Sequence, residues 1–126
     1  MGVRILENWP HTAMMHAWNR CLFGVAPSVG HEPCATVVLE GKAMIVSDRG
    51  GMRDMVLDGE TGFVVVPTPE TVCAAMARLI ADADLRQRTG AAGRARVSQF
   101  QARAVVDRIE HVYRTLIAPH AAMAAE

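Results

Sequence analysis

The sequence predicts an α/β fold, in which a short parallel sheet of three to four strands is flanked by helices. Two observations support this fold class. Short apolar runs bounded by turn residues alternate along the chain with patterns of helical period. Several of these runs are apolar at consecutive positions, as in the strands of a parallel sheet that is covered on both faces. Strands joined by helices in this way form right-handed crossovers within one sheet.

The predicted elements follow from apolar period and from turn residues. Trp9-Pro10-His11 ends a first strand, and Thr12 is the candidate N-cap of the helix that follows. In order, the predicted elements are a strand over 3–6, a helix over 12–19, a strand over 22–26, a short helix over 34–39, a strand over 43–47, a helix over 51–57, a strand over 62–66, a helix that opens at 68–70, and helices over 84–97 and 101–117.

The helix that opens at residue 68 has the clearest start signal. Thr68 supplies an N-cap hydroxyl, Pro69 stands in the first turn, and Glu70 lies near the positive end of the helix dipole. Two helices carry apolar stripes that should pack on other elements. The stripe of the first is Val72, Met76, Leu79 and Ile80, and that of the last is Val105, Ile109, Val112 and Leu116.

Length and charge limit the class of protein. A chain of 126 residues suits one domain, here residues 1–118, followed by an alanine-rich tail over 119–126 that we expect to be disordered. Thirteen acidic and thirteen basic side chains cancel, so no electrostatic reason exists to expect nucleic acid as a partner.

Cysteines and apolar runs bear on localisation. Cys21, Cys34 and Cys73 are an odd, widely spaced set, which favours reduced thiols in a cytoplasmic protein. No apolar run approaches the roughly 18–20 residues that span a bilayer, so any membrane contact would be peripheral. His11 and His31 have no companion at metal-ligand spacing, and we expect no metal and no cofactor.

The segment that organises the chain lies between the second and third predicted strands. It contains Pro27-Ser28, Glu32, and then Glu40 after seven further residues. If most of that span were helical, eight steps of about 1.5 Å would separate the two carboxylates by roughly 12 Å along the axis. That spacing suits two hydroxyl-bearing groups at opposite ends of one extended ligand, bound at the carboxyl end of a strand.

These residues resemble the retaining glycosyltransferases of GT-B fold, glycosyltransferase family 4 in particular. The resemblance runs from about Trp18 to Tyr113 and follows the order of the family's motifs. The matching segments are Pro27-Ser28, Glu32, Glu40, Ile45-Val46-Ser47-Asp48, Gly50-Gly51, Asp58-Gly59-Glu60-Thr61-Gly62 and the apolar strand from Phe63 to Pro67. The resemblance implies a partial Rossmann-like domain, half of a GT-B C-terminal domain, which binds the donor.

The resemblance also implies roles for particular residues. Glu32 would contact the donor sugar as the catalytic residue, and Glu40 would hold the ribose of a UDP-, GDP- or ADP-linked sugar. The N–H groups of Cys34, Ala35 and Thr36 would face the diphosphate. Gly50 and Gly51 would form one wall of the sugar pocket. The implied partner is a missing N-terminal acceptor domain or a second copy of the chain.

Three departures from the family pattern concern the same segment. Gly41 directly follows Glu40 and should end the helix there, which places Glu40 near the negative end of the dipole at a cost of a few tenths to about 1 kcal/mol. Ala35 stands where the family commonly has Gly, and Ala43 where it usually has Pro.

Two hypotheses therefore stand side by side. In the first, the chain is the donor-binding fragment of a retaining glycosyltransferase and is inactive alone. In the second, it is a non-catalytic α/β interaction module that pairs through an uncovered sheet edge. Glu32 and Glu40 would then be solvated acids. The motif order disfavours a third reading, a sugar-nucleotide epimerase. The nearby cations Lys42, Arg49 and Arg53 are expected on a solvated face.

Overall fold

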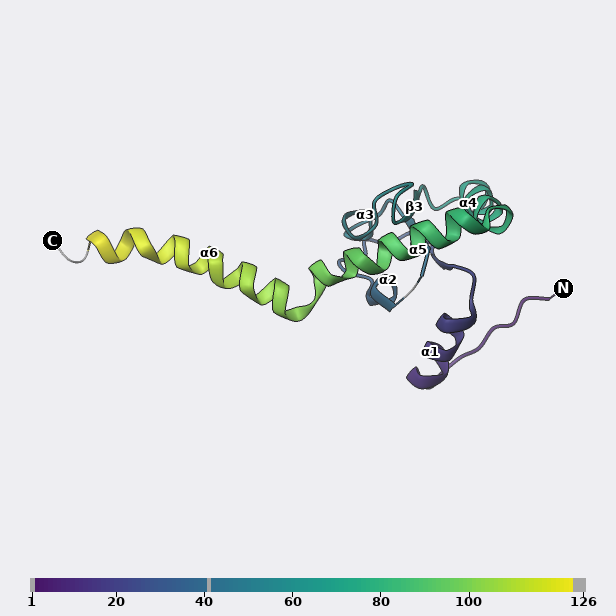
Figure 1. The fold of residues 1–126 in the computed structure, drawn as a ribbon, viewed down its shortest axis with the longest axis horizontal. Helices are drawn as coiled ribbons and strands as arrows, with labels where there is room; N and C mark the ends of the chain where they lie inside the picture. The colour runs from purple at the N-terminus through teal and green to yellow at the C-terminus, as the bar shows by residue number, and fades with distance from the viewer. Residues whose placement is uncertain (1, 41, 124–126) are drawn as a thin grey trace. The chain divides into compact units, whose positions relative to one another are not determined.

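The computed structural model describes residues 2–40 and 42–123. The chain forms two compact units, Met1–Arg94 and Ala95–Glu126. The first contains α1 (His11–Arg20), β1 (Gly24–Ala26), α2 (Thr36–Glu40), β2 (Met44–Ser47), α3 (Met52–Met55), β3 (Gly62–Val65), α4 (Pro69–Ala81) and most of α5 (Ala83–Val97) (Figure 1). The second contains η1 (Ser98–Phe100) and α6 (Ala102–Met123). The sequence predicts one domain over 1–118, and its apolar pattern gives no sign of a division after Arg94.

The described residues form a three-stranded parallel sheet in the order β1-β2-β3, which confirms the predicted α/β class. The register brings Val25, Ile45 and Phe63 side by side across the sheet. Neighbouring residues on the strands point to the opposite face, where Met44 lies between Gly24 and Gly62. Because the strands are parallel, their carboxyl ends lie at the same end of the sheet, where the Gly51 N–H donates to Glu32 O and joins the loops that follow β2 and β1.

The main core lies between this sheet and α4. Ile45, Phe63 and Leu79 are buried together with Ala43 and Ala75. Thr68 caps α4 as predicted, accepting a hydrogen bond from the Thr71 N–H at 3.4 Å. The predicted stripe is wrong at one position, because Ile80 is 59% exposed whereas the neighbouring Leu79 is fully buried.

The opposite face of the sheet is contacted by Trp18 of α1. A Cβ added at Gly24 would meet the Trp18 ring and the Met44 sulfur at 2.5 Å, so glycine leaves the space that these side chains fill. The predicted N-cap of α1 is wrong. The helix begins at His11 with Pro10 at the N-cap position, so Thr12 already lies in the first turn.

Helix α5 packs on the sheet through small residues. Cβ atoms added at Gly90 and Gly93 would lie 3.3 Å from Ala43 N and 3.1 Å from Thr61 O. Thr89 is buried on the same helix and donates its hydroxyl hydrogen to Leu85 O at 2.8 Å. Helix α5 therefore packs through close approach of its backbone to Ala43 and Thr61, and not through a stripe of large apolar side chains.

The predicted strand at the start of the chain is wrong. Residues 3–6 form no strand in the described part of the chain, and Val3 and Ile5 are 93% and 84% exposed. A strand needs a partner for its backbone groups, and β1 pairs only with β2 in this sheet. At the other end, α6 extends to Met123, in keeping with the helix propensity of alanine, and the disordered tail over 119–126 stays a prediction. Residues 124–126 lie outside the described residues.

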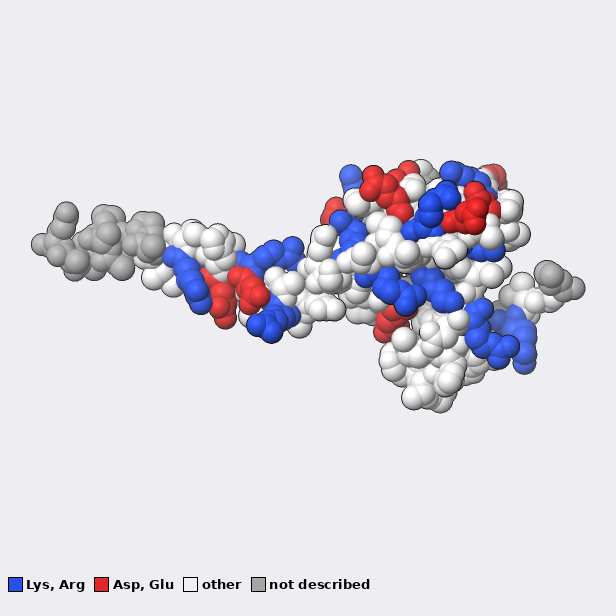
Figure 2. All heavy atoms as spheres, in the orientation of Figure 1, with Lys and Arg blue, Asp and Glu red and all other residues white. Residues whose placement is uncertain are grey.

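In the second unit, α6 is largely exposed along its apolar stripe. Ile109, Val112 and Leu116 are 50%, 53% and 61% exposed. On the face seen in Figure 2, basic and acidic side chains are interspersed along this helix, and Arg114 pairs with Glu110 at 3.1 Å. None of the helices in the part of the chain that the structure describes is long and apolar enough to cross a membrane.

Candidate functional site

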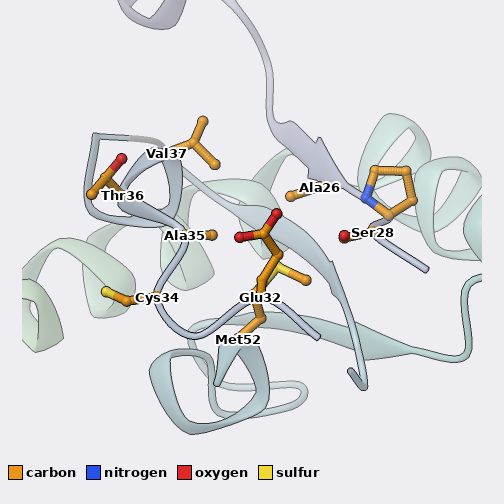
Figure 3. Close-up of a pocket in the computed structure, with 9 residues that line it drawn as sticks. Ala26, Ser28, Glu32, Cys34, Ala35, Thr36, Val37 and Met52 are labelled. Atoms are coloured by element: carbon orange, nitrogen blue, oxygen red, sulfur yellow. The ribbon is translucent and has the colours of Figure 1, made fainter. Parts of the chain in front are cut away.

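A pocket of about 460 Å³ lies at the edge of the sheet where the strands end. It is formed by the end of β1, the loop that follows, the start of α2 and the first residue of α3 (Figure 3). This is the place where parallel sheets bind ligands. The lining residues are Ala26, Pro27, Ser28, Glu32, Cys34, Ala35, Thr36, Val37 and Met52.

Glu32 is the only carboxylic acid among the described residues that line the pocket. Its carboxylate extends into the space between Ser28 and Ala35 (Figure 3). Glu32 lies in the loop before α2, which starts at Thr36, two residues later than the predicted start at residue 34. Pro33 favours a non-helical Glu32, since the residue before a proline is disfavoured in helical conformation. Among the described residues, none donates a hydrogen bond to the Glu32 carboxylate, so both of its oxygens are available to a ligand.

Cys34, Ala35 and Thr36 all line the pocket, and the contact of their N–H groups with a diphosphate stays a prediction. The Val38 N–H donates to Ala35 O at 2.9 Å, which makes Ala35 the residue just before α2. The Cys34 thiol points away from the Glu32 carboxylate in Figure 3 and lies 3.9 Å from the Met55 sulfur. Because α2 has only five residues, its dipole is small.

Glu40 is the last residue of α2, which confirms the predicted end of the helix. It is half-buried and does not line the pocket. The estimate of roughly 12 Å between the carboxylates assumed a mostly helical span, whereas only Thr36–Glu40 is helical. The structure therefore places Glu32 at the pocket but does not bring Glu40 to it.

Gly50 and Gly51 do not line this pocket either. They lie against the main chain of the loop that carries Glu32, and the Gly51 N–H donates to Glu32 O at 2.7 Å. Their part in a pocket wall stays a prediction. The contact that the structure shows is with the backbone of Glu32 and Pro33.

The sequence analysis assigned no role to five of the residues that line the pocket, and two of these, Ser28 and Met52, bear on the site. Ser28 follows β1 by two residues, a position at which parallel sheets commonly present polar groups to ligands. Met52 is the first residue of α3 and is fully buried, so it belongs to the hydrophobic core as well as to the pocket lining. The position of Ser28 relative to the strand end was the signal available in the sequence.

Of the three nearby cations, Lys42 and Arg49 have partners outside the pocket, whereas Arg53 is exposed, as expected. Lys42 donates to Asn19 O at 2.7 Å and to Cys21 O at 3.3 Å, near the carboxyl end of α1. This position corrects the expectation of a solvated Lys42. Burial raises the pKa of the Cys21 thiol above its ordinary value, and the Lys42 charge offsets part of that rise. Arg49 pairs with Asp48 at 3.2 Å. Within residues 2–40 and 42–123, no three His, Cys, Asp or Glu side chains gather as metal ligands.

Residues 2–96 match the model of the family described as glycosyl transferases group 1. Phosphatidyl-myo-inositol mannosyltransferases of Mycobacterium tuberculosis (strain H37Rv) and Mycobacterium bovis are each 37% identical over 100 residues. Each alignment covers 72% of this chain and 26% of the relative, so the chain spans about a quarter of these curated relatives.

The fold comparison agrees with the sequence comparison. Sucrose-phosphate synthase from Thermosynechococcus elongatus superposes with a TM-score of 0.64 and is 33% identical. The match covers 75% of this chain and 25% of the synthase chain. The chain therefore belongs to the group 1 family of glycosyl transferases.

Proposed function

We propose that this chain binds the donor of a retaining sugar transfer, a nucleotide-activated sugar linked to UDP, GDP or ADP. The observation that carries the proposal is the place of Glu32, whose carboxylate extends into a pocket at the carboxyl end of β1. A carboxylate accepts hydrogen bonds from two neighbouring hydroxyls, and these bonds are shorter and stronger than those between neutral groups. Glu32 would therefore hold vicinal hydroxyls of the donor sugar.

The rest of the donor would lie along the start of α2. Main-chain N–H groups of Cys34, Ala35 and Thr36 would contact the diphosphate, and the Ser28 hydroxyl is a further hydrogen-bonding group at the opposite side of Glu32. The ribose contact of Glu40 rests on the resemblance alone, because Glu40 does not line the pocket. The proposal includes no metal and no cofactor.

Transfer needs more positive charge than this pocket holds. In the reaction, the bond from the sugar to the diphosphate breaks, and an acceptor hydroxyl forms its bond on the same face of the ring. The leaving diphosphate must be stabilised electrostatically. None of the described residues that line the pocket is Lys or Arg.

We therefore propose that a further domain or another chain supplies these cations and the acceptor site. The small share of its relatives that the chain spans supports this. A cytoplasmic location is part of the proposal and rests on the three free cysteines.

Titration calorimetry tests the donor site. We expect UDP-glucose, GDP-mannose or ADP-glucose to bind the wild-type chain more tightly than the corresponding nucleoside diphosphate, because only the sugar reaches Glu32. Glu32→Gln keeps the shape of the side chain but removes its charge. It should weaken sugar-nucleotide binding about tenfold, or about 1.4 kcal/mol, and leave the nucleoside diphosphate unchanged. Glu60→Gln, an exposed acid in a turn outside the pocket, is the matched control.

The same titration separates the donor site from the interaction module. Equal affinity of wild type and Glu32→Gln for every sugar nucleotide would contradict the proposal. The apolar stripe of α6 favours the module, since Val105, Ile109, Val112 and Leu116 follow the four-three-four spacing with which two like helices pair, and the last three of them are exposed. Absence of binding together with a stable dimer in sedimentation would support a module that pairs with a second copy of this chain.

A further inference from the structure

The turn after β2 lies directly against the loop that carries Glu32. The Gly51 N–H donates to Glu32 O at 2.7 Å, and this bond joins residues that are far apart along the chain. A Cβ added at Gly51 would lie 2.1 Å from Pro33 O, and one added at Gly50 would lie 2.4 Å from Glu32 O. These neighbours are backbone atoms, which cannot move aside as a flexible side chain can. The two loops therefore touch at a distance that only glycine permits.

The two glycines are needed for different reasons. Gly50 has a φ of 61°, a left-handed conformation that favours glycine in any surroundings. Gly51 has φ −76° and ψ −7°, an ordinary helical conformation that any residue adopts. The backbone conformation does not require glycine at position 51. Glycine is needed at position 51 only because a Cβ would clash with Pro33 O. A substitution at position 51 therefore tests the contact between the two loops.

The turn is itself anchored in the core. Met52 follows Gly51 directly, is fully buried, and also lines the pocket. The Glu32 carboxylate, in contrast, receives no hydrogen bond from the described residues, so its place in the pocket depends on the course of its own backbone. The backbone of Glu32 is therefore fixed by its hydrogen bond from the Gly51 N–H. Gly51 is in turn fixed by the burial of the next residue, Met52.

We propose that Gly50 and Gly51 are positioning residues for Glu32, which set the depth of its carboxylate in the donor pocket through the backbone contact of the two loops. The inference rests on the proposed function for its consequence in binding, but the contact itself is independent of any ligand. A methyl group at position 51 would push the Glu32–Pro33 backbone away. It would break the bond from the Gly51 N–H and withdraw the carboxylate from the sugar.

Amide hydrogen exchange followed by NMR tests the contact without a ligand. In the wild-type chain, the Gly51 amide should exchange at least tenfold more slowly than the Gly30 amide. In Gly51→Ala, the amide of residue 51 should lose that protection while Ile45 in β2 keeps its own. Gly30→Ala is the matched control, because Gly30 lies in the same loop and a Cβ there meets nothing within 4 Å. An unprotected Gly51 amide in the wild type would overturn the proposal, even if Gly51→Ala does not fold.

Calorimetry with UDP-glucose, GDP-mannose and ADP-glucose, each against its nucleoside diphosphate, tests the consequence. Gly51→Ala should lose about the same tenfold affinity as Glu32→Gln, and the double variant should lose no more than Glu32→Gln alone. Additive losses in the double variant would show that Gly51 acts apart from Glu32 and would overturn the positioning role. If the wild type binds none of the three sugar nucleotides, the proposed function fails, and the exchange data still decide whether the glycines hold the loop.

Discussion

Replacing Leu79 by alanine is expected to lower the free energy of unfolding of the first unit by about 2–5 kcal/mol. Leu79 is fully buried and packs with Ile45, Phe63 and Ala75 between α4 and the sheet. Removing its three outer carbons loses their transfer free energy and leaves a cavity that neighbours fill only in part. Because a domain of this size is stable by about 5–15 kcal/mol in total, the loss is a large fraction. Urea unfolding followed by circular dichroism measures it.

The neighbouring residue provides the control. Ile80 has a comparable side chain on the same helix but is 59% exposed, so Ile80→Ala should change stability by no more than about 0.5 kcal/mol. Equal losses in the two variants would contradict the burial assigned to α4. They would mean that the helix packs on the sheet through a different face.

Gly62→Ala is expected to destabilise the sheet by about 1–3 kcal/mol or more, the range for overpacking a close-packed core. A Cβ at Gly62 would lie 2.3 Å from Met44 O on the adjacent strand and 2.9 Å from a Val56 methyl. The first contact is with backbone inside the sheet, which cannot yield without separating β2 from β3. The shift in the urea midpoint, at constant slope, measures the effect.

Two other glycines separate the crowding from the intrinsic effect of alanine. Gly30→Ala should be close to neutral, because its Cβ would meet nothing within 4 Å. Gly59→Ala should cost roughly 1–2 kcal/mol through its φ of 75° alone, since its surroundings are equally open. A loss at Gly62 no larger than that at Gly30 would refute the close approach of the strands.

The fold was predictable from the sequence where one local signal decides the structure. The strands over 24–26, 44–47 and 62–65 are short apolar runs between turn residues, and Thr68-Pro69 marks the start of α4. Two errors have tertiary causes. Residues 3–6 have strand-like composition but pair with no strand of the sheet, and Ile80 fits the period of α4 but lies at the edge of its buried face.

Packing between backbones left little trace in the apolar pattern. Helix α5 approaches Ala43 and Thr61 through Gly90 and Gly93. No stripe of large apolar residues in the sequence predicts this contact. The candidate site was likewise predictable only in part from the sequence. Sequence order placed Glu32 in a loop after a strand, and the structure puts it at a pocket. The contact of Gly51 with Glu32 joins two loops, so it could be seen only once the fold had brought them together.

The most direct test of the donor site is an NMR titration of the isotopically labelled chain with UDP-glucose, GDP-mannose and ADP-glucose. We expect the largest amide shift changes at Ser28, Glu32, Cys34, Ala35 and Thr36, smaller ones at Met52, and saturation with at least one of the three sugar nucleotides. Shift changes confined to α6 or to the exposed surface of α4, or no change with any of the three, would contradict a donor site at the end of β1.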